Sequence, residues 1–172
     1  MPAPQKNAFS IVPMTEAALP EIARLARAIW LDAYTGIVPD DQIEYMLAQR
    51  YSWRVLSADL RHPDKWLFQV EADGQRIGFV CCELCKGEFK VDKLYLLPAY
   101  QRRGIGGKLL DHAENLAREK GYDHFILAVN KGNTRAIAAY EKHGLRTRDA
   151  TQTPIGGGFI MDDYIMERRW GQ

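Results

Sequence analysis

The chain has 172 residues, of which 47% are hydrophobic and 26% are charged, and its formal net charge is +1. A chain of this length suits one domain and can bury a sizeable core. Because 23 Lys and Arg residues nearly balance 22 Asp and Glu residues, there is no global basic excess of the kind that favours nucleic acid or an anionic membrane surface as a partner. The aromatic content of 10% excludes a disordered or fibrous chain.

Three features predict a soluble cytoplasmic protein. No apolar run approaches the ~18 residues that a membrane-spanning helix needs. The polar residues 1–7 lack the cationic start and apolar stretch of a secretory signal. Three cysteines, two of them adjacent, make a poor disulfide framework for an exported protein. We therefore expect one domain over residues 8–170, preceded by a flexible extension over residues 1–7.

The N-terminal part of the chain predicts a short strand followed by two helices. Residues 8–12 form the strand, and apolar residues then recur at helical spacing as far as about Tyr34. Pro39 interrupts this pattern, and Asp40 is expected to cap the second helix. Residues 56–63 are expected to link this helix to the next strand, with at most a short helical turn.

The middle of the chain predicts an antiparallel meander of three strands, over residues 66–71, 76–85 and 89–97. Asp73-Gly74 lies between the first two strands and predicts a two-residue hairpin turn, because glycine supplies the positive φ that a type I′ turn demands.

The C-terminal part changes from strand to helix spacing and back. The expected elements are a helix over 105–121, a strand over 122–130, a helix over 133–144 and strands over 145–149 and 159–168. The glycine-rich residues 153–158 are expected to form a loop between the last two strands, either a mobile flap over a binding site or a loose connection. The whole order predicts an α/β domain with a single mixed, mostly antiparallel sheet flanked by helices.

Residues 94–108 carry the strongest chemical signal, since a strand ends there, a loop rich in Gly and Arg follows, and an amphipathic helix begins. Free N–H groups at a helix start form an anion site, and glycine lets the backbone approach a phosphate closely. A dinucleotide fingerprint fails because it needs glycine where Leu109 stands, and a Walker loop fails because it needs glycine at Arg102. A loop that simply opens a helix stays open as an alternative on these residues alone.

Two motifs in this order resemble the GCN5-related N-acetyltransferase (GNAT) family. The first is Gln101-x-x-Gly104-x-Gly106, and the second is Asn133-x-x-Ala136-x-x-x-Tyr140-x-x-x-Gly144. The resemblance covers roughly residues 66–145. It implies the GNAT fold and an enzyme that transfers the acetyl group of acetyl-CoA to a primary amine by direct attack in a ternary complex, with no metal.

The resemblance also implies where the cosubstrate binds. The strand positions that pair with the pantetheine arm are Leu94, Tyr95 and Leu96. The loop and helix start that hold the pyrophosphate comprise Gln101, Arg102, Arg103, Gly104, Ile105, Gly106, Gly107 and Lys108. Asn133 is the further position implied to contact the cosubstrate.

Acetyl transfer to an amine poses two proton problems. An alkylammonium with a pKa near ~10 must lose a proton before it attacks, and the departing thiolate is better stabilised if an acid protonates it. The resemblance places Tyr140 beside the coenzyme sulfur as that acid, and a phenol is still protonated at neutral pH. For the base we prefer Asp92, with Glu83 on the neighbouring strand, or water alone, as the alternatives.

The acceptor side is less defined by sequence. Trp30, Tyr34 and Asp32 lie in the N-terminal segment that covers the acceptor site in the resembled family, and the acidic pair Asp162-Asp163 could also reach it. A small amine or polyamine is the favoured acceptor. The alternatives are a protein or peptide amine and a non-catalytic acyl-CoA sensor, and exposed sheet edges are compatible with a homodimer.

No metal site is expected from the cysteines and histidines. Cys82 and Cys85 have C-x-x-C spacing but lie in a strand, where a spacing of three sends the two thiols to opposite faces. The chain has no second pair, and its histidines show no ligand spacing.

Overall fold

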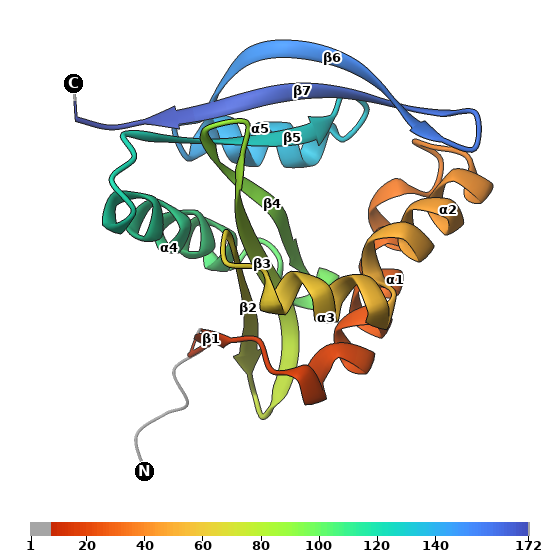
Figure 1. Ribbon diagram of the computed structural model, residues 1–172, viewed down its shortest axis with the longest axis horizontal. Coiled ribbons are helices and arrows are strands. Elements are labelled where there is room, and N and C mark those ends of the chain that lie inside the picture. The colour runs from red at the N-terminus through yellow and green to blue at the C-terminus, as the bar shows by residue number, and fades with distance from the viewer. Residues whose placement is uncertain (1–7, 172) are drawn as a thin grey trace.

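Seven strands form one mixed sheet in the order β1-β2-β3-β4-β5-β7-β6 in the computed structural model, which describes residues 8–171 (Figure 1). The strands are β1 (Ser10–Pro13), β2 (Lys65–Ala72), β3 (Gln75–Cys85), β4 (Glu88–Leu96), β5 (His124–Asn130), β6 (Arg146–Gly156) and β7 (Phe159–Arg169). All neighbouring strands are antiparallel except β4 and β5, which are parallel. This topology confirms the predicted fold class. The predicted extension, residues 1–7, lies outside the described residues.

Helices cover both faces of this sheet. They are α1 (Leu19–Tyr34), α2 (Asp40–Tyr51), α3 (Trp53–Arg61), α4 (Ile105–Glu119) and α5 (Thr134–Lys142), with short 3₁₀ turns at Glu16–Ala18 and Pro98–Tyr100. One buried cluster lies between the sheet and α1, α2 and α3, and a second lies on the α4 and α5 side. Strand alternation supplies both clusters, so neighbouring residues such as Cys81 and Cys82 belong to opposite cores. All three cysteines are free thiols.

Three local predictions were wrong. The expected linker over residues 56–63 is mostly the helix α3, whose start is capped by the Ser52 hydroxyl accepting the Val55 N–H. Asp40 is not a cap but the first residue of α2, where no side chain caps the helix. The expected loop over residues 153–158 is largely strand, because β6 pairs with β7 as far as Gly156.

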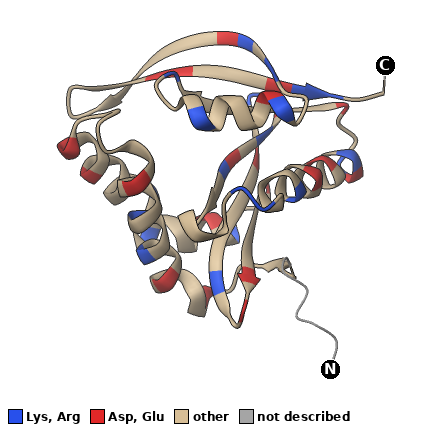
Figure 2. Cartoon of the chain, turned by 180° about the vertical axis from the view of Figure 1, so that it is seen from behind, with Lys and Arg blue, Asp and Glu red and all other residues tan. Residues whose placement is uncertain are grey.

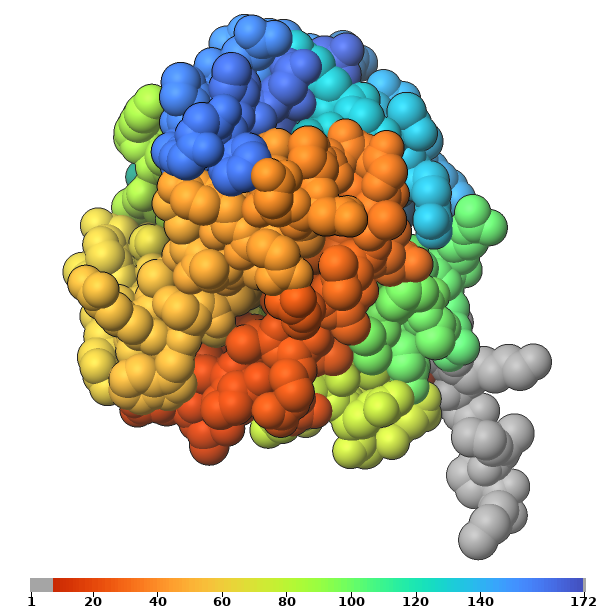
Figure 3. Space-filling model, turned by 90° about the vertical axis from the view of Figure 1, so that its right-hand side faces the viewer, coloured from red at the N-terminus to blue at the C-terminus, as the bar shows by residue number. Residues whose placement is uncertain are grey.

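The tip of the β6–β7 hairpin packs on α2, which explains why this segment is ordered strand rather than loop (Figure 3). The Tyr45 hydroxyl donates to the Ile155 carbonyl (3.1 Å), and its ring lies 5.2 Å from that of Phe159. A side chain at Gly156 would clash with Tyr45, and Gly156 also has a positive φ of 96°. Glycine is therefore needed there for close packing and for the backbone conformation.

The centre of the sheet splits between β4 and β5. The two parallel strands pair only through Lys90 with Ile126 and Val91 with Leu127. Beyond these pairs β4 continues to Leu96 with no described strand paired on that edge, and Figure 1 shows β5, β6 and β7 running across the direction of β2, β3 and β4. The sheet thus opens directly after Val91, and the residues lining the opening come from both halves.

Acidic and basic residues are interspersed along the chain. Figure 2 shows acidic and basic residues on the same helices. Within residues 8–171 there is no helix both long and apolar enough to cross a bilayer.

Candidate active site

The start of α4 is an open, electropositive helix end. Gly104 has a φ of 82° and precedes the helix, and no described side chain caps it. The first backbone bond there joins the Lys108 N–H to the Gly104 carbonyl (3.3 Å), so the N–H groups of residues 105–107 have no acceptor within the helix. A Cβ added at Gly106 would meet nothing within 4 Å. This end can accept an anion such as a pyrophosphate.

The glycine that follows has a different role. A Cβ at Gly107 would clash with the His143 ring, so Gly107 lets the start of α4 pack against the end of α5. Of the loop glycines, Gly104 and Gly106 face open space and Gly107 faces the protein.

The side chains around the loop before α4 have two roles. One holds the loop in place by hydrogen bonds, and three others carry positive charge. The side-chain amide of Gln101 is hydrogen bonded within the protein: its nitrogen donates to the Leu96 carbonyl (3.0 Å) and its oxygen accepts from Arg135 (3.2 Å). The side chains of Arg102, Arg103 and Lys108 are exposed. Gln101 therefore holds the loop against the end of β4, while these three cations surround the helix start.

One edge of β4 is free along the opening. Leu94, Tyr95 and Leu96 pair with β3 on one side. On the other side, the pairing of β4 with β5 ends at Val91. Their other backbone groups can hydrogen bond to an extended ligand that lies along the strand. The predicted pantetheine positions and the predicted pyrophosphate loop thus form one continuous surface.

Tyr34 reaches the opening from α1. Its hydroxyl lies 3.1 Å from the Tyr95 hydroxyl. Burial raises the pKa of Tyr34, and hydrogen bonding to Tyr95 and to Asn133 offsets this only partly. Asn133 also caps α5, as predicted for the start of that helix, with its side-chain oxygen accepting the Ala136 N–H (3.3 Å).

Tyr140 lies on α5 next to this group. Its pKa is raised by burial and by the nearby Tyr34 phenol, and no hydrogen bond contributes to the shift. The phenol is therefore protonated at neutral pH, and its proton is free to be given to a ligand. The structure brings Tyr140, Asn133 and Tyr34 together, although they come from opposite ends of the chain.

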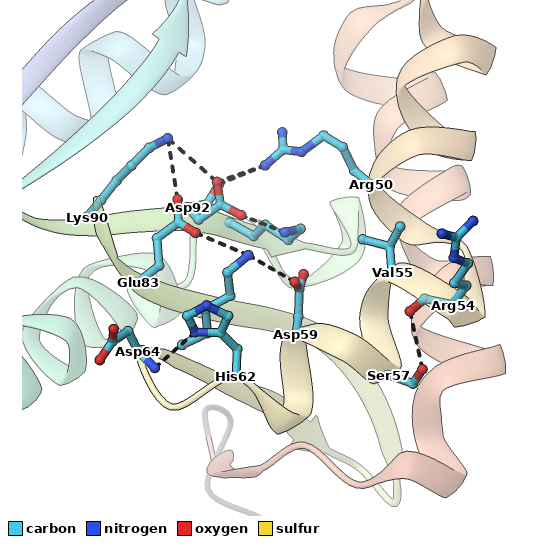
Figure 4. Close-up of polar contacts among 12 residues, drawn as sticks. Arg50, Arg54, Val55, Ser57, Asp59, His62, Asp64, Glu83, Lys90 and Asp92 are labelled. Atoms are coloured by element: carbon cyan, nitrogen blue, oxygen red, sulfur yellow. Dashed lines mark hydrogen bonds and ion pairs between the residues drawn. The ribbon is translucent and has the colours of Figure 1, made fainter. Parts of the chain in front are cut away.

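Asp92, the predicted base, is surrounded by cations (Figure 4). Its carboxylate oxygens lie 3.0 Å from Arg50, 2.6 Å from Lys93 and 3.7 Å from Lys90. Burial opposes its ionisation, but Arg50 and Lys93 outweigh burial and hold the pKa of Asp92 well below its usual range. Glu83 lies at the edge of the same network, 3.8 Å from Lys90. A carboxylate held in this way is a weak proton acceptor.

We expect Asp92→Asn to lower the free energy of unfolding at pH 7 by about 3–5 kcal/mol, because it leaves Arg50 and the buried Lys93 without their counter-charge. Since the pKa of Asp92 is lowered in the folded state, its stabilisation is present above the unfolded pKa of ~3.9 and is lost as the pH falls below that value. Urea unfolding at several pH values measures both effects.

The matched control is Glu16→Gln, which breaks the exposed pair with Arg61 and should cost less than about 1 kcal/mol. An Asp92→Asn loss no larger than that of the control would show that the network does not stabilise the fold.

The other two residues predicted for the acceptor site, Trp30 and Asp32, lie in different environments. Trp30 is buried, and its indole N–H donates to the Tyr51 hydroxyl (3.1 Å). It is therefore a core residue next to the site. Asp32 is exposed on α1, two residues from both Trp30 and Tyr34 and thus on the other side of the helix. Arg50 was missed, because a single arginine in an amphipathic helix carries no signal that it will turn inward.

Comparison with known proteins places this geometry in a family. The family model described as "Acetyltransferase (GNAT) family" matches residues 23–145. The chain belongs to this family. The predicted resemblance is confirmed, and the protein is an acetyltransferase of the GNAT family.

Two relatives differ in how much of this GNAT chain they match. Spermidine N(1)-acetyltransferase of Thermoplasma acidophilum is 27% identical over 156 residues, covering 88% of this chain and 91% of that protein. The [ribosomal protein bS18]-alanine N-acetyltransferase of Escherichia coli is 28% identical over 98 residues, covering 56% of this chain and 66% of that protein.

Solved structures show the same fold. PaiA N-acetyltransferase from Thermoplasma acidophilum, in complex with coenzyme A, superposes with a TM-score of 0.83 at 26% identity, covering 95% of this chain and 99% of that one. A GCN5-related N-acetyltransferase from Rhodopseudomonas palustris has a TM-score of 0.79 at 19% identity, covering 94% and 95% of the two chains, and shows the fold alone.

Proposed function

We propose that this GNAT enzyme transfers the acetyl group of acetyl-CoA to a primary amine of a small polycation such as a polyamine. The observation that carries the proposal is the continuous surface from the uncapped start of α4, along the free edge of β4, to the Tyr140 phenol. A phosphate-bearing thioester bound along it would bring its acyl end to the opening of the sheet.

The cosubstrate is recognised at two places. The N–H groups of residues 105–107 and the charges of Arg102, Arg103 and Lys108 would bind the pyrophosphate. The backbone edge of Leu94, Tyr95 and Leu96 would pair with the amides of the pantetheine arm. The complex of PaiA N-acetyltransferase with coenzyme A supports this use of the fold.

Chemistry takes place where the two halves of the sheet part. The neutral amine attacks the acetyl carbonyl carbon, the new C–N bond forms, and the C–S bond breaks. The departing thiolate takes the proton of Tyr140, which the raised pKa keeps on the phenol until a base of this kind is formed. The phenolate is then reprotonated by the proton that the new amide nitrogen gives up.

The acceptor class follows from aromatic and acidic groups near the opening. Tyr34 comes from α1 and Asp163 from β7, and an aromatic ring beside a carboxylate favours a cationic amine. The spermidine N(1)-acetyltransferase of Thermoplasma acidophilum, which matches most of this chain, supports a polyamine. The relative that acts on ribosomal protein bS18 supports a peptide α-amine over a shorter stretch.

The test is release of coenzyme A thiol from acetyl-CoA with spermidine, spermine, an aminoglycoside, lysine and an alanine-terminated peptide. We expect kcat/KM for the polyamines to exceed that for the peptide at least about tenfold, the scale of one lost ion pair in a closed site. A higher kcat/KM for the peptide than for the polyamines would indicate a protein acetyltransferase. Binding of coenzyme A by calorimetry without turnover of any amine would indicate a sensor.

A further inference from the structure

Asp163 is a buried residue whose carboxylate has an oxygen with no partner among residues 8–171. It lies on β7, opposite Asn130 at the end of β5, and its side chain is buried with only 7% of the residue exposed. Its Oδ1 atom has no hydrogen-bond partner, and within residues 8–171 no lysine or arginine nitrogen lies within ion-pair distance of it. Buried polar atoms are normally hydrogen bonded, so this oxygen is available to a donor from outside the described chain.

The neighbouring Asp162 shows the contrast. It points to the other face of β7 and pairs with Lys131 at 2.6 Å, with about half of its side chain (49%) exposed. The two adjacent aspartates therefore have opposite environments, because strand residues alternate between faces.

The ionisable groups around Asp163 come from every element packed near it. They are Tyr34 of α1, Arg50 of α2, Lys90 of β4, Lys131 of the β5–α5 connection and Asp162 of β7. Arg50 and Lys90 are already paired with Asp92, so neither is free to neutralise Asp163. Burial raises the pKa of Asp163, and these two cations oppose the shift without cancelling it.

Asp163 lies at the β5 end of the connection that leads into α5, the helix that carries Tyr140: it is opposite Asn130, whose carbonyl accepts the N–H of Asn133 at the start of α5 (2.9 Å). The Tyr34 phenol interacts electrostatically with the Asp163 carboxylate and with the Tyr140 phenol. Asp163 thus reaches the opening from the β7 side and Tyr140 from the α5 side. Asp92, in contrast, reaches its cations from β4 and keeps no free oxygen to offer a ligand.

We propose that Asp163 binds the ammonium group of the acceptor and takes its proton. The proposal rests on the proposed function and names the base for it. The ammonium N–H bond breaks and its proton moves to the unpartnered oxygen of Asp163, which leaves a neutral amine with a lone pair for the acetyl carbonyl carbon. The coenzyme thiol is formed with the proton of Tyr140, and Asp163 later gives its proton to solvent, so that one proton is released per turnover.

The test compares Asp163→Asn with Asp162→Asn, a matched change on the opposite face of the same strand. We expect Asp163→Asn to lower kcat/KM for spermidine about 100-fold or more, the range for loss of a general base, and to leave the calorimetric affinity for coenzyme A within about twofold. Asp162→Asn should keep kcat/KM within about threefold of the wild type.

Two readouts separate a base from a merely structural residue. The deficit of Asp163→Asn should narrow as the pH approaches ~10, because the amine then arrives without its extra proton. Spermidine added with coenzyme A should raise the melting temperature of the wild type and of Asp162→Asn, but not of Asp163→Asn.

Retained turnover in Asp163→Asn, or a deficit that is constant with pH, would overturn this assignment and leave the proposed function intact. A wild-type protein that neither acetylates spermidine nor is stabilised by it would overturn the polyamine proposal and the Asp163 assignment together.

Discussion

Tyr140→Phe is expected to lower kcat for amine acetylation about 100-fold or more, because the variant has no proton for the departing thiolate. Burial and Tyr34 raise the pKa of this phenol, so in the wild type the group is fully protonated at neutral pH. No hydrogen bond contributes to that shift, so the loss of the oxygen should leave the fold unchanged. The rate of coenzyme A thiol release at saturating acetyl-CoA and amine measures kcat for both enzymes.

Tyr122→Phe is the control for this variant. Tyr122 is a half-buried tyrosine that packs on Phe89 and lies between α4 and β5, outside both motifs, and its variant should keep kcat within about twofold. Coenzyme A affinity should be unchanged in both variants. A Tyr140→Phe enzyme with wild-type kcat would mean that the thiolate leaves without an acid, as the low pKa of a thiol permits.

Gly106→Asp should nearly abolish coenzyme A binding and leave the protein as stable as before. Gly106 is the second residue of α4, and a side chain there meets nothing within 4 Å. A carboxylate at this position favours the helix start by about 0.3–1 kcal/mol, and replacing glycine within a helix adds a similar amount. The same carboxylate would stand beside the pyrophosphate, where two like charges at ~4 Å repel by about 4 kcal/mol.

The expected result is a loss of coenzyme A affinity of about 100-fold or more by calorimetry, with a melting temperature equal to or above that of the wild type. Gly106→Ala isolates the charge, since it changes the backbone in the same way, and should bind coenzyme A within about threefold of the wild type. If Gly106→Asp binds coenzyme A as tightly as Gly106→Ala, the pyrophosphate does not lie at this helix start.

Most of the fold was predictable because short-range patterns control it. The hairpin at Asp73-Gly74 formed as expected, with both residues at positive φ. α3 was missed because its nine residues are too few to show a clear helical repeat of apolar side chains, and packing against β2 and α1 stabilises the helix. The end of β6 was missed because Pro154 and three glycines favour a loop, although an edge strand paired on one side tolerates proline.

The site was predictable in part. The two motifs locate the loop, Asn133 and Tyr140 on adjacent elements, and the structure brings them to one opening of the sheet. The roles of the carboxylates were not predictable in this way. Asp92 has a favourable sequence position for a base, yet three cations from α2 and β4 surround it, and Arg50 is 42 residues away.

The sequence by itself determined the features that depend on a few adjacent residues: the glycine turn before α4, the Asn133 cap of α5 and the tyrosine two turns later. Only the tertiary structure decided which acidic side chain is paired with cations and which is not. The affinity of a carboxylate for a proton depends on burial and on charges from elements distant in sequence. Asp92 is neutralised by such charges, whereas Asp163 is buried with an oxygen that has no partner in the part of the chain that the structure describes.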